Sequence, residues 1–189
     1  MKTIGLIGGM SWESTVTYYQ LINDYVKARL GGLHSAKLLL YSVDFEEIER
    51  WQASGDWDKS AQRLTEIAKK LEGAGADFIV ICTNTMHKVA PQMEKELSIP
   101  ILHIADATAD ALLEAGIRTV GLLGTKYTMT QDFYKSRLER RGLSVVIPDA
   151  AGVEQGNNVI YQELCLGVIR EESRACYRQI IDQLKDKGA

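Results

Sequence analysis

The sequence predicts an α/β protein in which parallel sheets are flanked by helices. Short apolar runs, typical of strands buried on both faces, alternate with longer segments of helical periodicity. The alternation starts again near residue 105, and the residues at 3–8 (TIGLIG) resemble those at 119–124 (TVGLLG). Because an internal repeat indicates a repeated architecture, we expect two similar halves, residues 1–104 and 105–189.

The first element is a strand at 3–8, and a glycine turn separates it from a helix that runs to about Leu30. Ser11 or Ser14 can cap this helix at its start, and Gly31-Gly32 ends it. Its apolar residues recur roughly on one face. They are Val16, Tyr19, Ile22, Val26 and Leu30.

The rest of the first half continues the alternation. Strands are predicted at 37–43, 78–82 and 99–102, where β-favouring apolar residues run between turn residues. Asp44 and Asp56 start two helices that Gly55 and Gly75 end, and a third helix covers about 85–96, where Pro91 can break it. The helix after Asp56 should bury Ala61, Leu64, Ile67, Ala68 and Leu71.

The second half is expected to follow the same order. Helices are predicted at 106–115 and 129–141, strands at 119–123 and 143–147, a Gly- and Asn-rich loop at 149–157, and helices at 157–167 and 171–187. The spacing of Ile180, Leu184 and Gly188 repeats a spacing that, in the first half, leads into the strand before Thr83. We therefore expect a further strand beyond Ala189 with a cysteine about eight residues on, and a second half that is incomplete in these 189 residues.

Composition excludes several classes of protein. The chain has 189 residues, a net charge of −3 and no basic patch, so nucleic acid is not an expected partner. No apolar run approaches the ~18 residues of a membrane span, and the N-terminus lacks a signal-peptide layout. Three cysteines form an odd, sparse set that favours the reducing cytoplasm.

The candidate site lies where the buried strand at 78–82 meets the polar residues Thr83, Asn84 and Thr85. Ligands of open α/β sheets bind outside the carboxyl ends of strands, and Asn84 can cap the next segment so that its N–H groups hold an anion. Met10 and Ser11 follow the first strand and should lie at the same edge. An ordinary strand-to-helix turn would have the same pattern.

Other chemistries are less well supported. The first turn lacks the G-x-G-x-x-G spacing, so no nicotinamide or flavin cofactor is expected, and there is no P-loop. The spacing of Cys82 and the histidines matches no zinc pattern. Cys82 and Thr83 point to opposite sides of the strand, so only one of them can face a ligand; the other is expected to be a buried structural residue.

The segment Cys82-Thr83-Asn84-Thr85-Met86-His87 resembles the Cys-Asn-Thr-Ala-His signature of the aspartate/glutamate racemase family. The residues at 8–11 (GGMS) resemble the family's first turn, and Gly124-Thr125 with Thr128 and Met129 resembles its middle turn. This resemblance covers the whole chain. It implies two similar α/β lobes with the active site in the cleft between them, a cytoplasmic homodimer, an aspartate- or glutamate-like substrate and no cofactor.

The resemblance also implies a mechanism and shows two departures. Family members take the α-proton from one face of an amino acid and return a proton from the other, with one acid/base residue, typically cysteine, from each lobe. Here the first cysteine aligns with Thr83, and the second lies beyond Ala189, since Cys165 and Cys176 do not match its motif. Asn84, Thr85 and Thr125 are expected to hold the substrate carboxylate with Met10 and Ser11 nearby, and Gln52 to contact the substrate side chain.

We therefore expect a cofactor-independent amino-acid racemase in which Thr83 is a catalytic residue. A threonine hydroxyl is a much weaker acid than a thiol, so Thr83 should donate a proton better than it accepts one. Two alternatives remain. One is a relative that acts on one face only, similar to arylmalonate decarboxylase, and the other is a non-catalytic binder of small carboxylates.

Overall fold

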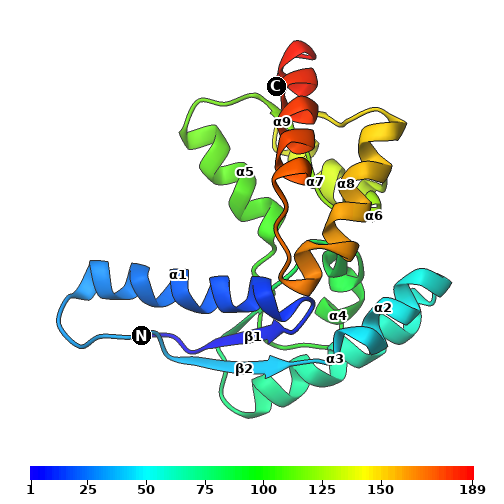
Figure 1. Ribbon diagram of the computed structural model, residues 1–189. Coiled ribbons are helices and arrows are strands. Elements are labelled where there is room, and N and C mark those ends of the chain that lie inside the picture. The colour runs from blue at the N-terminus through cyan, green and yellow to red at the C-terminus, as the bar shows by residue number, and fades with distance from the viewer. The chain divides into compact units, whose positions relative to one another are not determined.

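The computed structural model describes residues 1–189 and divides the chain into two compact units, Met1–His103 and Ile104–Ala189. Each unit contains a parallel sheet with helices packed against it, which confirms the predicted α/β fold class. The elements can be followed from the N-terminus to the C-terminus by colour in Figure 1.

The first unit is built on a three-stranded parallel sheet. Its strands are β1 (Ile4–Gly8), β2 (Leu38–Ser42) and β3 (Phe78–Ile81), in the order β2-β1-β3. The predicted strand at 99–102 is reduced to one parallel bridge between Ile79 and Ile101. Pro100 accounts for part of this difference, because proline lacks the N–H that a longer ladder would need.

Two helices of this unit begin directly after the aspartates that were predicted to start them. The Asp44 carboxylate accepts from the N–H of Glu46 (3.2 Å) at the start of α2 (Phe45–Ser54), and Asp56 accepts from Lys59 (3.3 Å) at the start of α3 (Trp57–Gly73). The predicted apolar face of α3 is confirmed, since all five of its residues are buried: Ala61, Leu64, Ile67, Ala68 and Leu71.

The apolar face predicted for α1 (Trp12–Leu30) is largely exposed. Val16, Tyr19 and Leu30 are each about half exposed, and Thr15 is the only buried residue of this helix. Figure 1 shows α1 on one side of β1 and β2, with α3 on the other. A helix of 19 residues is about 28 Å long, whereas a strand of five residues spans only about 17 Å, so much of α1 extends beyond the sheet.

The helix predicted over 85–96 is also divided. A 3₁₀ turn, η1 (Thr85–Val89), leads into the short helix α4 (Ala90–Glu94), and Pro91 lies in the first turn of α4. Proline clashes with the carbonyl four residues earlier but is tolerated in the first helical turn. The α-helix therefore starts at Ala90 instead of running through Pro91.

The second unit contains the parallel pair β4 (Thr119–Gly121) and β5 (Ser144–Val146). Helices α5 (Ile104–Glu114) and α7 (Asp132–Arg140) pack together, and α9 (Glu171–Asp186) packs against β4. The helix predicted over 129–141 is interrupted at Gln131, whose extended backbone separates α6 (Lys126–Thr130) from α7. A buried cluster joins α5, α7 and the segment before β5: Ala105, Ala109, Tyr134, Leu138 and Leu143.

The loop predicted over 149–157 is wrong, because α8 (Ala150–Gln162) covers most of it. Asp149 caps this helix by accepting from the N–H of Gly152 at 2.8 Å. A Cβ on Gly152 would lie 2.8 Å from the Cβ of Pro148, and the Gly156 carbonyl accepts from the Tyr177 hydroxyl at 3.1 Å. Close packing and a tertiary hydrogen bond thus outweigh the low helix propensity of glycine. The helix predicted over 157–167 is the second half of α8, which ends at Gln162 and is followed by the 3₁₀ turn η2 (Leu164–Leu166).

Candidate functional site

The carboxyl ends of the three strands meet at one edge of the first unit. Gly8 is paired with Ser42, and Ile7 with Ile81, in the parallel register. Beyond these pairs, the N–H of Cys82 donates to the Ile7 carbonyl at 2.9 Å. The turn after β1 and the polar segment after β3 therefore start at the same edge, where open α/β sheets bind ligands.

The turn after β1 depends on Gly9. Its φ is +90°, and a Cβ there would lie 2.3 Å from the carbonyl oxygen of Val43, so this position requires glycine. The N–H of Gly9 donates to Thr15 Oγ1 at 2.8 Å. This turn places Met10 and Ser11 at the sheet edge, where both are largely buried.

Ser11 precedes α1 but does not cap it with its side chain, contrary to the prediction. Instead, its carbonyl oxygen lies 2.9 Å from Ser14 Oγ and 3.1 Å from Thr15 Oγ1. Ser14 Oγ is also 3.1 Å from the carbonyl oxygen of Cys82, so this hydroxyl links the first turn to the end of β3. The sequence indicated Ser14 only as a cap, and no local pattern signals this long-range role.

Cys82 and Thr83 have different surroundings. Cys82 is fully buried, and burial raises the pKa of its thiol to about 12. Thr83 is half-buried, Asn84 is exposed and Thr85 is buried. The predicted buried role of Cys82 agrees with these values. At neutral pH its thiol stays protonated and cannot act as a base.

Asn84 does not cap the next segment with its side chain, contrary to the prediction. Its carbonyl oxygen accepts from the N–H of His87 at 3.1 Å and closes the 3₁₀ turn. The Asn84 amide thus extends from an exposed position at the sheet edge.

The side chain of His87 contacts the backbone of Thr83, a contact that the sequence did not reveal. Its Nδ1 lies 2.8 Å from the carbonyl oxygen of Thr83, which can only accept, so Nδ1 carries the proton. The ring is buried and packs on His103, with the ring centroids 4.4 Å apart. The four-residue spacing from Thr83 to His87, one helical turn, is the signal that indicates this contact.

Gln52 comes from α2 and lies beside the same segment. Its side chain is only 3% exposed, and Nε2 lies 2.9 Å from the sulfur of Met86. The structure therefore brings Gln52 next to the segment that begins at Thr83. Met10, Ser11, Gln52 and Thr83–Thr85 all belong to the first unit.

Thr125 belongs to the second unit, where it caps α6. Its Oγ1 accepts from the N–H of Thr128 at 3.3 Å. The next N–H, of Lys126, donates to Asn157 Oδ1 at 3.0 Å. Asn157 is a further polar residue of this turn that the sequence did not identify, since it lies in the predicted loop.

The candidate residues offer hydroxyl, amide and backbone N–H groups but no carboxylate or ammonium group. Such groups suit a ligand carboxylate, and they stabilise negative charge that develops on it. The structure contains no group of three or more His, Cys, Asp or Glu side chains arranged to hold a metal ion. None of its helices has the length and apolar character needed to cross a membrane.

Comparisons with known proteins point to one family. The model of the Asp/Glu/hydantoin racemase family matches residues 7–189. A candidate Asp/Glu racemase from Yersinia pestis has a crystal structure that is 57% identical, with a TM-score of 0.91, and the match covers 100% of this chain and 83% of that one.

Two further relatives are more distant. An aspartate racemase homologue from Pyrococcus horikoshii is 37% identical, with a TM-score of 0.82, over 100% of this chain and 82% of that one. A broad-specificity amino-acid racemase from Bacillus subtilis is 25% identical over 181 residues, which are 89% of this chain and 78% of that protein.

Proposed function

This chain belongs to the Asp/Glu/hydantoin racemase family, and on this premise we propose that it racemises acidic amino acids without a cofactor, with Thr83 as one acid/base residue. The predicted family and enzyme class, an amino-acid racemase, are confirmed by the family match and by the racemases among its relatives. The preference for acidic substrates and the roles of single residues are our proposals.

One observation carries the assignment of Thr83. It is the second residue after β3 and is partly exposed, whereas the adjacent thiol of Cys82 is fully buried with a pKa raised to about 12. A residue that exchanges a proton with the substrate must be reachable by it. Cys82 is fully buried and Thr83 is not, so we assign the chemistry at this strand end to Thr83.

Racemisation breaks the bond between Cα and its hydrogen and leaves the electron pair on the α-carbon and its carboxylate. Hydroxyl and N–H donors stabilise that charge, and Asn84 and Thr85 supply such donors beside Thr83. A base on one face of the α-carbon takes the α-proton, and inversion is complete when a second group gives a proton from the opposite face. Because a threonine hydroxyl is a poor base, we assign Thr83 the second step, in which the hydroxyl gives its proton to the α-carbon and is then reprotonated from water.

Chiral chromatography of reactions with each enantiomer of aspartate, glutamate, alanine and leucine tests this proposal. We expect aspartate and glutamate to be inverted faster than the two uncharged amino acids. Calorimetry with the same compounds separates the alternative of a non-catalytic binder, which would bind aspartate without inverting it. Inversion that requires added pyridoxal phosphate would overturn the cofactor-independent mechanism.

We also propose that the protein is a homodimer, and the exposed surface of α1 supports this. Large apolar side chains at Trp12, Val16, Tyr19 and Leu30 lie within one stripe of the helix and are each more than half exposed. Exposed apolar patches on this scale are typical of protein interfaces. Light scattering coupled to size exclusion would give the mass of a dimer.

A further inference from the structure

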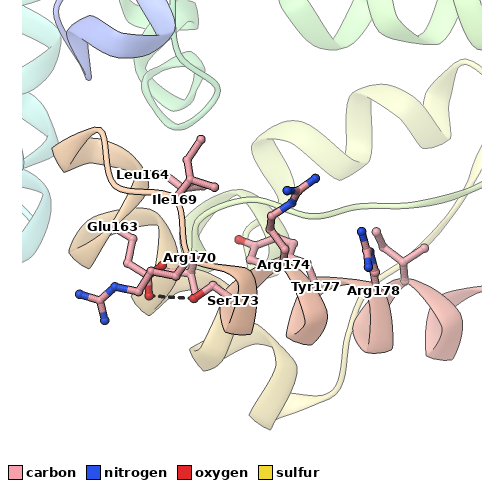
Figure 2. Close-up of a pocket in the computed structure, with 10 residues that line it drawn as sticks. Glu163, Leu164, Ile169, Arg170, Ser173, Arg174, Tyr177 and Arg178 are labelled. Atoms are coloured by element: carbon pink, nitrogen blue, oxygen red, sulfur yellow. Dashed lines mark hydrogen bonds between the residues drawn. The ribbon is translucent and has the colours of Figure 1, made fainter.

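A pocket of about 310 Å³ lies within the second unit, between the end of α8 and the first turns of α9 (Figure 2). Its residues lie between Val159 and Ile181, and none of them belongs to the candidate catalytic site. The proposed racemase activity therefore leaves this pocket without a role.

The pocket carries unpaired positive charge. Arg174 and Arg178 are four residues apart on one side of α9, and Arg170 lies just before this helix, with its side chain pointing away from theirs in Figure 2. Arg174 pairs with Glu171 at 2.7 Å, but Arg170 and Arg178 make no ion pair. Two guanidinium groups are thus free to hold an anion, and a carboxylate matches their fork of donors.

Glu163 also lines the pocket, and one of its two carboxylate oxygens lacks a hydrogen-bond donor. Its Oε1 accepts from Ser173 Oγ at 2.8 Å, shown by the dashed line in Figure 2. Its Oε2 is buried and has no hydrogen-bond partner. A buried carboxylate oxygen without a donor is unfavourable. Because the terminal torsion of glutamate is broad, a small rotation can present Oε2 to a donor that enters the pocket.

The remaining wall is apolar. Ile169 is 73% exposed and Leu164 is 41% exposed, although both line a pocket. The ring of Tyr177 is fixed because its hydroxyl donates to the carbonyl of Gly156 at 3.1 Å. These surfaces would bury the hydrocarbon part of a small ligand, and that burial is favourable.

We propose that this pocket binds a free amino acid with an apolar side chain, at a second site separate from the candidate catalytic site. The ammonium group of the ligand donates to Glu163, its carboxylate is held by Arg170, and its side chain packs on Ile169, Leu164 and the ring of Tyr177. A simple anion would satisfy the arginine but leave Oε2 of Glu163 without a donor. This proposal is independent of the racemase activity.

Ligand-detected NMR and calorimetry on the whole chain, with L-leucine as the probe, test the proposal. N-acetyl-L-leucine lacks the ammonium group and L-leucinamide lacks the carboxylate, so each removes one of the two charged contacts. We expect saturable one-to-one binding of leucine and at least tenfold weaker binding of both analogues, since each contact is a charge-assisted hydrogen bond.

Matched variants locate the site. Glu163→Gln and Arg170→Gln keep the size of each side chain, and each should weaken leucine binding about 10- to 100-fold. Glu172→Gln and Lys185→Gln change the same charges on α9 outside the pocket and should leave it unchanged. Asn84→Ala removes an amide proposed to hold the substrate carboxylate, and it should also leave leucine binding unchanged, which separates this site from the catalytic one. Circular dichroism checks that each variant is folded.

Three results would overturn the proposal. They are no saturable binding of leucine, equal binding of leucine and N-acetyl-leucine, or weaker leucine binding in Asn84→Ala with unchanged binding in Glu163→Gln. The second would identify a pocket for amphipathic anions, and the third would place leucine at the candidate catalytic site.

Discussion

Replacing Gly9 with alanine should destabilise the first unit and disturb the site together. The backbone of Gly9 has a φ of +90°, and an added Cβ would lie 2.3 Å from the carbonyl oxygen and 2.6 Å from the nitrogen of Val43. Both contacts are with backbone atoms, which cannot swing away. Gly55 is a matched control, because its φ is +75° but nothing lies within 4 Å of an added Cβ.

Comparing the two variants separates the cost of backbone strain from the cost of a steric clash with the added Cβ. A left-handed conformation costs a non-glycine residue about 1–2 kcal/mol, and both variants pay this cost. Forcing an extra carbon into a packed position costs about 1–3 kcal/mol more, and only Gly9→Ala carries this second cost. We therefore expect Gly9→Ala to lower the free energy of unfolding by about 2–5 kcal/mol and Gly55→Ala by about 1–2 kcal/mol.

Urea unfolding followed by tryptophan fluorescence measures this difference. The three tryptophans, Trp12, Trp51 and Trp57, all lie in the first unit, so the signal reports on that unit alone. Gly9→Ala should also lower racemisation more than Gly55→Ala, since the turn it disturbs carries Met10 and Ser11. Equal stability of the two variants would refute the assigned packing of Gly9 against Val43.

The remaining predictions concern other features. His87→Ala should lower kcat about tenfold with little change in KM, and His87→Asn should restore part of the rate because its amide can still donate to the Thr83 carbonyl. Cys82 should resist iodoacetamide in the folded protein at pH 8 while being alkylated in urea, as mass spectrometry will show; its reaction in the folded state would contradict the observed burial. The Cys82 thiol has a pKa raised from 9.0 to about 12, so the unfolded state loses its proton first and stability falls as pH rises above 9, by about 1.4 kcal/mol at pH 10. Cys82→Ala should lack this pH dependence in urea titrations. Val16→Asp combined with Tyr19→Asp should convert a dimer into a monomer in light scattering, and a dimer that persists would show that α1 is not the interface.

Much of the fold could be predicted because local signals and tertiary packing agree. The apolar face of α3 lies against the sheet as its periodicity indicates, and Asp44 and Asp56 begin helices that their side chains cap. The buried strand before Thr83 is equally clear, since its apolar run ends sharply at polar residues. In these segments a single local rule is enough to give the structure.

The sequence predictions are wrong where a contact with a residue far away in the sequence determines the local structure. The segment at 149–157 looks like a loop because Gly and Asn disfavour helices, yet close packing at Gly152 and the bond from Tyr177 to Gly156 hold it as a helix. The helical periodicity of α1 is correct, but periodicity does not show how far a helix extends beyond its sheet.

The candidate site could likewise be predicted only where local sequence signals were sufficient. Strand alternation was enough to separate Cys82 from Thr83. The bridge from Ser14 to Cys82 and the pocket at Glu163 join residues whose proximity no local pattern reveals.

The inversion of aspartate, followed by chiral chromatography for each enantiomer, tests the assignment of Thr83 most directly. We expect Thr83→Ala to slow inversion at least about 100-fold while calorimetry shows aspartate binding little changed. Thr83→Cys should keep the activity, because a thiol is a competent acid and base near neutral pH, and Cys82→Ala should have little effect. If Cys82→Ala abolishes inversion and Thr83→Ala does not, the acid/base residue at this strand end is Cys82 and the assignment to Thr83 is wrong.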